Sequence, residues 1–164
     1  MHVRAERPSD IQAIAQLNDR AFGGSYESEL VDRLRADGLV AASLVAEDEG
    51  RIVGHILLSR LDVTVGKRKP SALALAPMAV LPERQRRGIG STLVRAAIKA
   101  ARDASADIIV VLGHPAFYSR FGFSAARAAK LAAPFSGDAF MVHEITPSAL
   151  GDGNGTVTYP PAFD

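Results

Sequence analysis

One stretch of the sequence decides the fold, and it reads Ala76-Pro77-Met78-Ala79-Val80-Leu81-Pro82-Glu83-Arg84-Gln85-Arg86-Arg87-Gly88-Ile89-Gly90-Ser91. It starts as an apolar strand, passes through a glycine-rich turn that carries arginines, and continues into a segment with helical periodicity. The first turn of a helix presents unpaired N–H groups and the positive end of the helix dipole. Glycines let the backbone approach a ligand closely, and arginines add charge-assisted hydrogen bonds. The stretch therefore indicates an anion site that suits phosphate groups.

The segments on either side predict a strand–helix–strand unit. A strand is expected from about Ser71 to Val80, and an amphipathic helix from near Gly88 to around Ala104. The run from Asp107 to Leu112 is continuously apolar, which is typical of a strand buried on both faces. Residues 72–112 thus predict one right-handed βαβ crossover.

The N-terminal part predicts a short strand, two helices and a hairpin. The strand is expected from Val3 to Glu6, and the first helix follows a cap at Ser9 and stops at Gly23-Gly24. The second helix ends at Gly38, and the hairpin spans Val40 to Val63.

The C-terminal part adds a short helix from Pro115 to Phe121 and a strand from Ala139 to Ile145. Together the patterns predict an α/β protein of α+β type, with a mixed central sheet of about six to seven strands flanked by about four helices. We expect a single domain over residues 1–164.

Composition excludes several classes of protein. The chain has 164 residues, no cysteine, and 19 basic against 18 acidic residues. The lack of cysteine excludes disulfide scaffolds and thiolate metal sites, and no histidine pair has zinc-ligand spacing, so we expect no metal. The net charge of +1 gives no electrostatic case for nucleic acid or membrane partners. The polar N-terminus lacks a signal peptide's apolar segment, so a cytoplasmic location is expected.

The glycine pattern distinguishes between phosphate-binding motifs. The dinucleotide motif fails because Leu93 stands at its third glycine, and no Gly-Lys pair follows Gly88 as a P-loop requires. The pattern that fits is Gln-x-x-Gly-x-Gly, residues 85–90, which resembles the pyrophosphate motif of the GNAT superfamily of acyl-CoA-dependent N-acyltransferases. The ordered elements, the segment His114 to Phe123 and the tail Tyr159 to Phe163 extend the resemblance over nearly the whole chain, toward a bacterial subgroup with little substrate assignment.

The resemblance implies acetyl-CoA as co-substrate, held between a splayed parallel pair of strands. The pantetheine arm is expected along the backbone of Met78, Ala79 and Val80, where a backbone N–H near Ala79 holds the developing oxyanion. The pyrophosphate is expected on the turn, whose residues are Gln85, Arg86, Arg87, Gly88, Ile89, Gly90 and Ser91.

The resemblance also implies catalytic residues. Tyr118 matches the tyrosine that protonates the departing thiolate in many members of the family. Many members carry a glutamate on the strand before the turn, but Leu73 to Val80 holds no ionisable residue. The base is therefore open between His114 at the end of the apolar strand, proton release to bulk water, and an amine that arrives neutral.

The expected acceptor is an amine on a small molecule or a peptide, and the resemblance allows a homodimer. Glu29 and His55 are the candidate acceptor contacts, each weighed against a structural interpretation. Glu29 alone is typical of a surface charge, and His55 of a hydrogen-bonded histidine inside the hairpin.

Two other functions compete with the predicted N-acetyltransferase. One is a catalytically silent module that binds or senses acyl-CoA, which the missing strand glutamate leaves open and Tyr118 argues against. The other is a nucleotide-binding protein that uses the Gly88 turn for a different phosphate.

Overall fold

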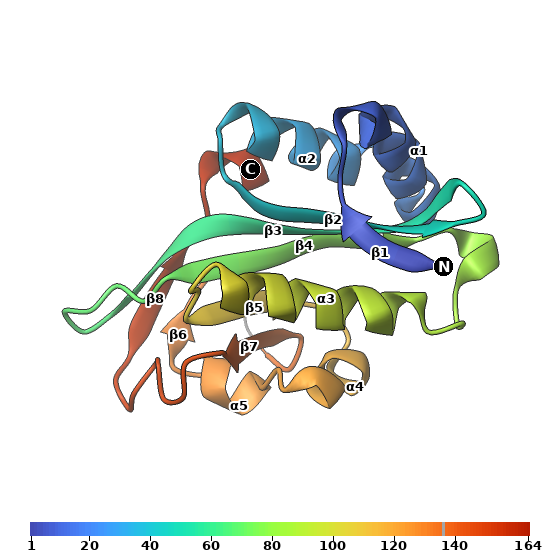
Figure 1. The fold of residues 1–164 in the computed structure, drawn as a ribbon. Coiled ribbons are helices and arrows are strands. Elements are labelled where there is room, and N and C mark those ends of the chain that lie inside the picture. Colours follow the sequence, from blue (N-terminus) through green and yellow to red (C-terminus); the bar gives the residue numbers. More distant parts are fainter. Residues whose placement is uncertain (136) are drawn as a thin grey trace. The chain divides into compact units, whose positions relative to one another are not determined.

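The computed structural model describes residues 1–135 and 137–164, which form eight strands and five α-helices. The strands are β1 His2–Ala5, β2 Val40–Asp48, β3 Arg51–Val65, β4 Ala72–Val80, β5 Ile108–Leu112, β6 Leu131–Ala132, β7 Phe140–Glu144 and β8 Gly155–Thr158. The helices are α1 Ile11–Phe22, α2 Tyr26–Ala36, α3 Ile89–Asp103, α4 Pro115–Tyr118 and α5 Ala125–Ala128 (Figure 1).

The strands belong to a mixed sheet in the order β1-β2-β3-β4-β5-β7, with β8 pairing with β3 and β6. Strands β4 and β5 are parallel, with Ala72 opposite Ile108 and Ala74 opposite Val110. This confirms the predicted fold class. The numbers of strands and helices exceed the expected ones because β6, β8 and α5 are too short to leave a periodic pattern.

The chain divides into two compact units, which we describe separately. The first contains Met1–Ser59 and Ala76–Ala100, and the second contains Arg60–Leu75 and Ala101–Asp164. The single domain over residues 1–164 stays a prediction. Along the described ranges, no helix has the length and apolarity that crossing a membrane requires.

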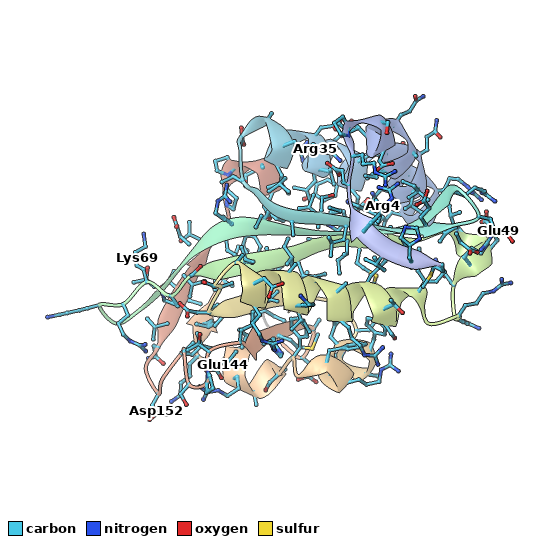
Figure 2. The ribbon with its side chains drawn as sticks, in the orientation of Figure 1. Arg4, Arg35, Glu49, Lys69, Glu144 and Asp152 are labelled. Carbon is cyan, nitrogen blue, oxygen red and sulfur yellow. The ribbon has the colours of Figure 1, made fainter. Side chains whose placement is uncertain are left out.

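In the first unit, β2 and β3 form the predicted hairpin, with Asp48 opposite Arg51. The two residues between them, Glu49 and Gly50, have left-handed φ angles of 50° and 77°. That conformation matches the turn to the right-handed twist of the strands. Figure 2 labels Glu49 at this turn.

Helices cover both faces of this hairpin, α1 and α2 on one face and α3 on the other (Figure 1). Two neighbouring residues of β3 show why, because successive side chains of a strand point to opposite faces. A Cβ atom at Gly54 would lie 2.9 Å from Cδ1 of Leu93 in α3. His55 points to the opposite face, where its Nδ1 lies 3.3 Å from the side-chain amide nitrogen of Asn18 in α1.

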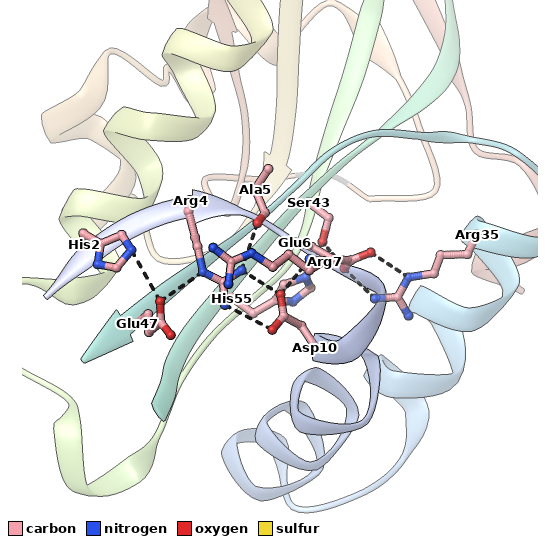
Figure 3. Close-up of polar contacts among 10 residues, drawn as sticks. All are labelled: His2, Arg4, Ala5, Glu6, Arg7, Asp10, Arg35, Ser43, Glu47 and His55. Carbon is pink, nitrogen blue, oxygen red and sulfur yellow. Dashed lines mark hydrogen bonds and ion pairs between the residues drawn. The ribbon is translucent and has the colours of Figure 1, made fainter. Parts of the chain in front are cut away.

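Asp10 fixes the entry into α1. Its carboxylate accepts a hydrogen bond from the backbone N–H of Arg7 at 2.6 Å and two from the Arg4 guanidinium at 2.7 and 3.1 Å (Figure 3). The predicted cap at Ser9 is wrong, because a 3₁₀ turn, Pro8–Asp10, precedes α1 and makes Asp10 its N-cap residue. Asp10 also binds the Arg4 guanidinium through hydrogen bonds that are charged at both ends, which a serine hydroxyl cannot form.

A directional chain of hydrogen bonds runs through the fully buried His55 (Figure 3). The Asn18 amide donates to Nδ1, so Nε2 carries the proton and donates to the Ser43 hydroxyl at 2.9 Å. Ser43 donates to Glu6 at 2.6 Å, and Glu6 also accepts from Arg35 at 2.6 Å. The chain ties α1, β2, β3 and α2 together, and it requires His55 to be neutral.

In the second unit, apolar side chains from β3, β4, β5, β7 and β8 form one core. Residues 108–111 of β5 are buried as predicted, but Leu112 at the end of the strand is 48% exposed. Asp107 fixes the start of the parallel pair, because its carboxylate accepts from the backbone N–H of Ser71 and the hydroxyl of Thr146, both at 2.8 Å.

The burial of His55 predicts a loss of stability in mild acid. Burial lowers the pKa of His55 from 6.5 to about 4, so the folded state binds its proton less readily than the unfolded chain. The free energy of unfolding should therefore be highest above pH 6.5 and fall as the pH drops toward about 4, by on the order of 2–3 kcal/mol.

Urea unfolding at a series of pH values measures this slope. The variant His55→Gln should flatten it, whereas His2→Gln, which removes an exposed histidine, should not. An equal slope in His55→Gln and the wild type would contradict the prediction.

Candidate active site

The turn between β4 and α3 has the geometry of an anion site. Arg86 and Gly88 adopt left-handed φ angles of 64° and 83°, and a Cβ at Gly88 would meet nothing within 4 Å. The left-handed conformation favours glycine at position 88, and open space lies beside it. The 15-residue helix α3 follows directly, and the hydroxyl and N–H of Thr92 both bond to the carbonyl of Gly88. The N–H groups of the first turn have no carbonyl four residues earlier within the helix.

The turn is attached to the end of β4. The Gln85 side-chain amide donates to the carbonyl of Val80 at 3.2 Å, and the N–H of Leu81 donates to the carbonyl of Val53 at 2.9 Å. In the last part of β4, Pro77 and Ala79 are buried while Met78 is half-buried. The structure therefore brings together the two sets of residues that the sequence predicts for the pantetheine and the pyrophosphate.

The three arginines before Gly88 differ in their surroundings. Arg86 and Arg87 are exposed. Arg84 donates to Asp48 at 2.6 Å, and its side chain is only 21% exposed. The carboxylate of Asp48 therefore already engages the charge of Arg84, and Arg86 and Arg87 are the arginines available to a ligand.

In the second unit, Tyr118 ends helix α4 in an aromatic cluster. Its ring makes edge contacts with Phe117 and Phe123, at centroid distances of 4.9 and 5.6 Å. Burial raises the pKa of Tyr118 to about 12, so its hydroxyl keeps its proton at neutral pH.

His114 stands at the other end of the same helix. It is the N-cap residue of α4, its carbonyl accepts from the N–H of Tyr118 at 3.1 Å, and its side chain is exposed. The structure thus places both candidate catalytic residues on one turn of helix, with an accessible imidazole and a buried phenol.

The two candidate acceptor contacts have different environments. Glu29 is exposed on α2 and accepts a hydrogen bond from Ser25 at 3.4 Å. His55 has no exposed surface, and both ring nitrogens lie within hydrogen-bond distance of side chains. His55 therefore fits the interpretation as a hydrogen-bonded histidine inside the hairpin, because a fully buried ring with both nitrogens engaged has no atom that a substrate could reach.

Sequence reasoning missed Gly113, between β5 and α4. A Cβ there would lie 2.9 Å from Cδ2 of Tyr118 and overlap Cε2. The ring of Tyr118 thus packs directly on the backbone of Gly113. The signal in the sequence was a glycine at the end of a predicted strand with no turn-forming residue beside it. Such a glycine often marks a place where another group packs closely on the backbone.

The chain resembles known acetyltransferases in sequence. Residues 11–123 match the acetyltransferase (GNAT) family. The chain is 34% identical over 167 residues to the uncharacterized N-acetyltransferase YhbS of Escherichia coli (strain K12), covering 100% of this chain and 99% of the relative.

Two solved structures resemble the fold over nearly its whole length. The crystal structure of YhbS from Escherichia coli in complex with CoA matches with a TM-score of 0.88 and 33% identity, over 99% of this chain and 91% of that one. A GNAT family acetyltransferase from Brucella melitensis in complex with acetyl-CoA matches with a TM-score of 0.82 and 36% identity, over 99% and 97% of the two chains.

The contact between Gly113 and Tyr118 predicts a large effect of one methyl group. Gly113→Ala should lower the free energy of unfolding by about 1–3 kcal/mol, because the ring must leave its position. The loss should vanish when Gly113→Ala is combined with Tyr118→Ala, which removes the ring.

Urea unfolding of the four proteins in this cycle measures the coupling. Gly153→Ala is the matched control, since a Cβ there would lie an ordinary 3.7 Å from Val65. Equal losses with and without the Tyr118 ring would refute the contact.

Proposed function

The chain belongs to the GNAT family of acetyltransferases, and on that premise we propose that it transfers an acetyl group from acetyl-CoA to a primary amine, by direct attack in a ternary complex. The observation that carries the proposal is the turn before α3, where left-handed Arg86 and Gly88 precede the start of a long helix. The likeness to two proteins solved with CoA and acetyl-CoA supports the same ligand.

The turn suits a diphosphate for three physical reasons. The open space at Gly88 admits phosphate oxygens, and the amides of Ile89 and Gly90 stand at the positive end of the helix dipole. The exposed guanidinium groups of Arg86 and Arg87 add charge-assisted hydrogen bonds.

We assign the pantetheine arm to the last part of β4. The parallel register with β5 joins residues 72–74 to 108–110, and β4 continues to Val80. Peptide groups of Met78 and Val80 then pair with the amides of the arm. The N–H near Ala79 binds the thioester oxygen and stabilises the negative charge that develops on it.

Tyr118 assists the departure of the thiolate. The amine nitrogen attacks the carbonyl carbon, a C–N bond forms, and the C–S bond breaks as the phenol gives its proton to sulfur. The raised pKa of about 12 keeps the phenol protonated until that moment. The phenolate recovers a proton from the solvent or from the nitrogen of the newly formed amide, which must lose one proton to become neutral.

The acceptor amine must lose a proton to become a nucleophile. We assign this role to His114, the exposed imidazole on the helix of Tyr118, because an imidazole nitrogen can accept a proton from an amine. Glu29, exposed on α2, supplies a carboxylate for a cationic acceptor.

A thiol-release assay with acetyl-CoA and a panel of amines tests the proposal. Release of CoA that depends on the amine supports acetyl transfer. Binding of CoA without turnover across the panel would favour the silent module, which the lack of an ionisable residue from Leu73 to Val80 allows. Thermal stabilisation by ATP at lower concentration than by CoA would favour the nucleotide-binding alternative.

Removing one hydroxyl tests the role of Tyr118. Tyr118→Phe should lower kcat by about 10²- to 10⁴-fold, with the dissociation constant of CoA almost unchanged. Tyr159→Phe is the matched control, because burial raises the pKa of that second tyrosine to about 12 as well. An unchanged kcat in Tyr118→Phe would remove Tyr118 from the mechanism.

Removing two charges tests the diphosphate site. The double variant Arg86→Gln, Arg87→Gln should weaken CoA binding by at least about tenfold, and the difference should shrink as salt rises. Lys67→Gln with Lys69→Gln removes the same charge from the hairpin between β3 and β4, where Figure 2 labels Lys69, and should leave affinity unchanged. Titration calorimetry measures both, and equal affinities would place the diphosphate elsewhere.

A further inference from the structure

The segment that leads into the glycine turn is held by ion pairs on two sides. This segment, the 3₁₀ helix η2, comprises Pro82–Arg84. On one side, the Glu83 carboxylate accepts two hydrogen bonds from the Arg20 guanidinium of α1, at 3.1 and 2.9 Å. On the other, Arg84 donates to Asp48 at the end of β2, at 2.6 Å. Consecutive residues of opposite charge thus anchor η2 to two different elements.

The backbone around η2 is fixed as well. The N–H of Arg84 donates to the carbonyl of Leu81 at 2.8 Å, and the Leu81 N–H donates to Val53 of β3 at 2.9 Å. The left-handed residues Arg86 and Gly88 come directly after this anchored segment. Their position therefore depends on where η2 is held.

The charges of this group do not belong to the ligand site itself. Hydrogen bonding to Arg84 lowers the pKa of Asp48, and hydrogen bonding to Arg20 lowers the pKa of Glu83, so both carboxylates stay ionised at neutral pH. Each of them engages a guanidinium group. Arg84 is thereby committed to a contact within the protein, unlike the exposed Arg86 and Arg87 that follow it.

We propose that Asp48 and Arg20 are positioning residues for the diphosphate of acetyl-CoA. By holding Arg84 and Glu83, they fix the turn from Gln85 to Gly88 in its binding conformation before the ligand arrives. A turn that is already ordered loses less conformational freedom on binding, so it binds the ligand more tightly than a flexible turn would. The inference rests on the proposed function, because it concerns the same diphosphate.

A double-mutant cycle on Asp48 and Arg84 tests the proposal. Asp48→Asn and Arg84→Gln should each weaken CoA binding and raise KM for acetyl-CoA by about three- to tenfold, with kcat unchanged. The double variant should be no weaker than either single one, since both changes release the same contact. A purification tag belongs at the C-terminus, because the N-terminal ammonium lies 3.4 Å from the Asp48 carboxylate.

Asp62 and Lys69 provide a matched control. They form a 4.0 Å ion pair with exposed side chains in the second unit, and Asp62→Asn with Lys69→Gln should leave CoA affinity unchanged. Arg20→Gln is the second test variant, because its side chain is 52% exposed and its loss should not threaten folding. It should weaken CoA binding in the same direction as Asp48→Asn.

The outcomes separate this inference from the proposed function. A wild-type protein that takes up no CoA overturns both. Wild-type CoA affinity retained in Asp48→Asn and in Arg20→Gln overturns the inference alone. The inference is also overturned if Arg84→Gln weakens CoA binding more than Asp48→Asn does and the two losses of affinity add in the double variant. Arg84 would then contact phosphate directly.

Discussion

The site in the first unit depends on the close packing of α3 against β3 at Gly54. A Cβ at Gly54 would lie 2.9 Å from Leu93 and 3.0 Å from Ile89, so a side chain there would push the helix away. Ile89 is the first residue of α3, and its burial fixes the helix end from which the amides of the first turn project. An anion site built from backbone N–H groups can be no more precise than the helix end that carries them.

The sequence predicted the features that repeat along the chain and missed those that depend on one distant contact. Periodicity gave α1, α2, α3 and the hairpin to within a few residues, because burial of one face imposes a regular pattern. The Asp10 cap was missed because its strongest partner, Arg4, is outside the helix. Gly113 and the Asp48–Arg84 pair were missed for the same reason, since no local pattern indicates which side chain will lie beside them.

Two buried ionisable groups, His55 in the first unit and Tyr118 in the second, show that burial can favour the neutral form for different purposes. Burial lowers the pKa of His55 and raises the pKa of Tyr118, and in each case it favours the neutral form. His55 has side-chain partners at both ring nitrogens, so its neutrality completes a hydrogen-bond chain that ties four elements together. Tyr118 is surrounded mainly by rings, so its neutrality preserves a proton that it can donate.

Much of the proposed chemistry comes from main-chain groups, and this limits what side chains reveal about the substrate. In the proposed function, the part of acetyl-CoA that does not vary is bound by the peptide groups of Met78 to Val80 and by the amides at the start of α3. Any residue type with the right φ and ψ angles supplies them, which is why the glycines carry the recognisable pattern. Under the same proposal the acceptor is selected by exposed side chains such as Glu29. A change at such an exposed position leaves the core of the fold intact, so under this proposal proteins with the same backbone can differ in the amine that they modify.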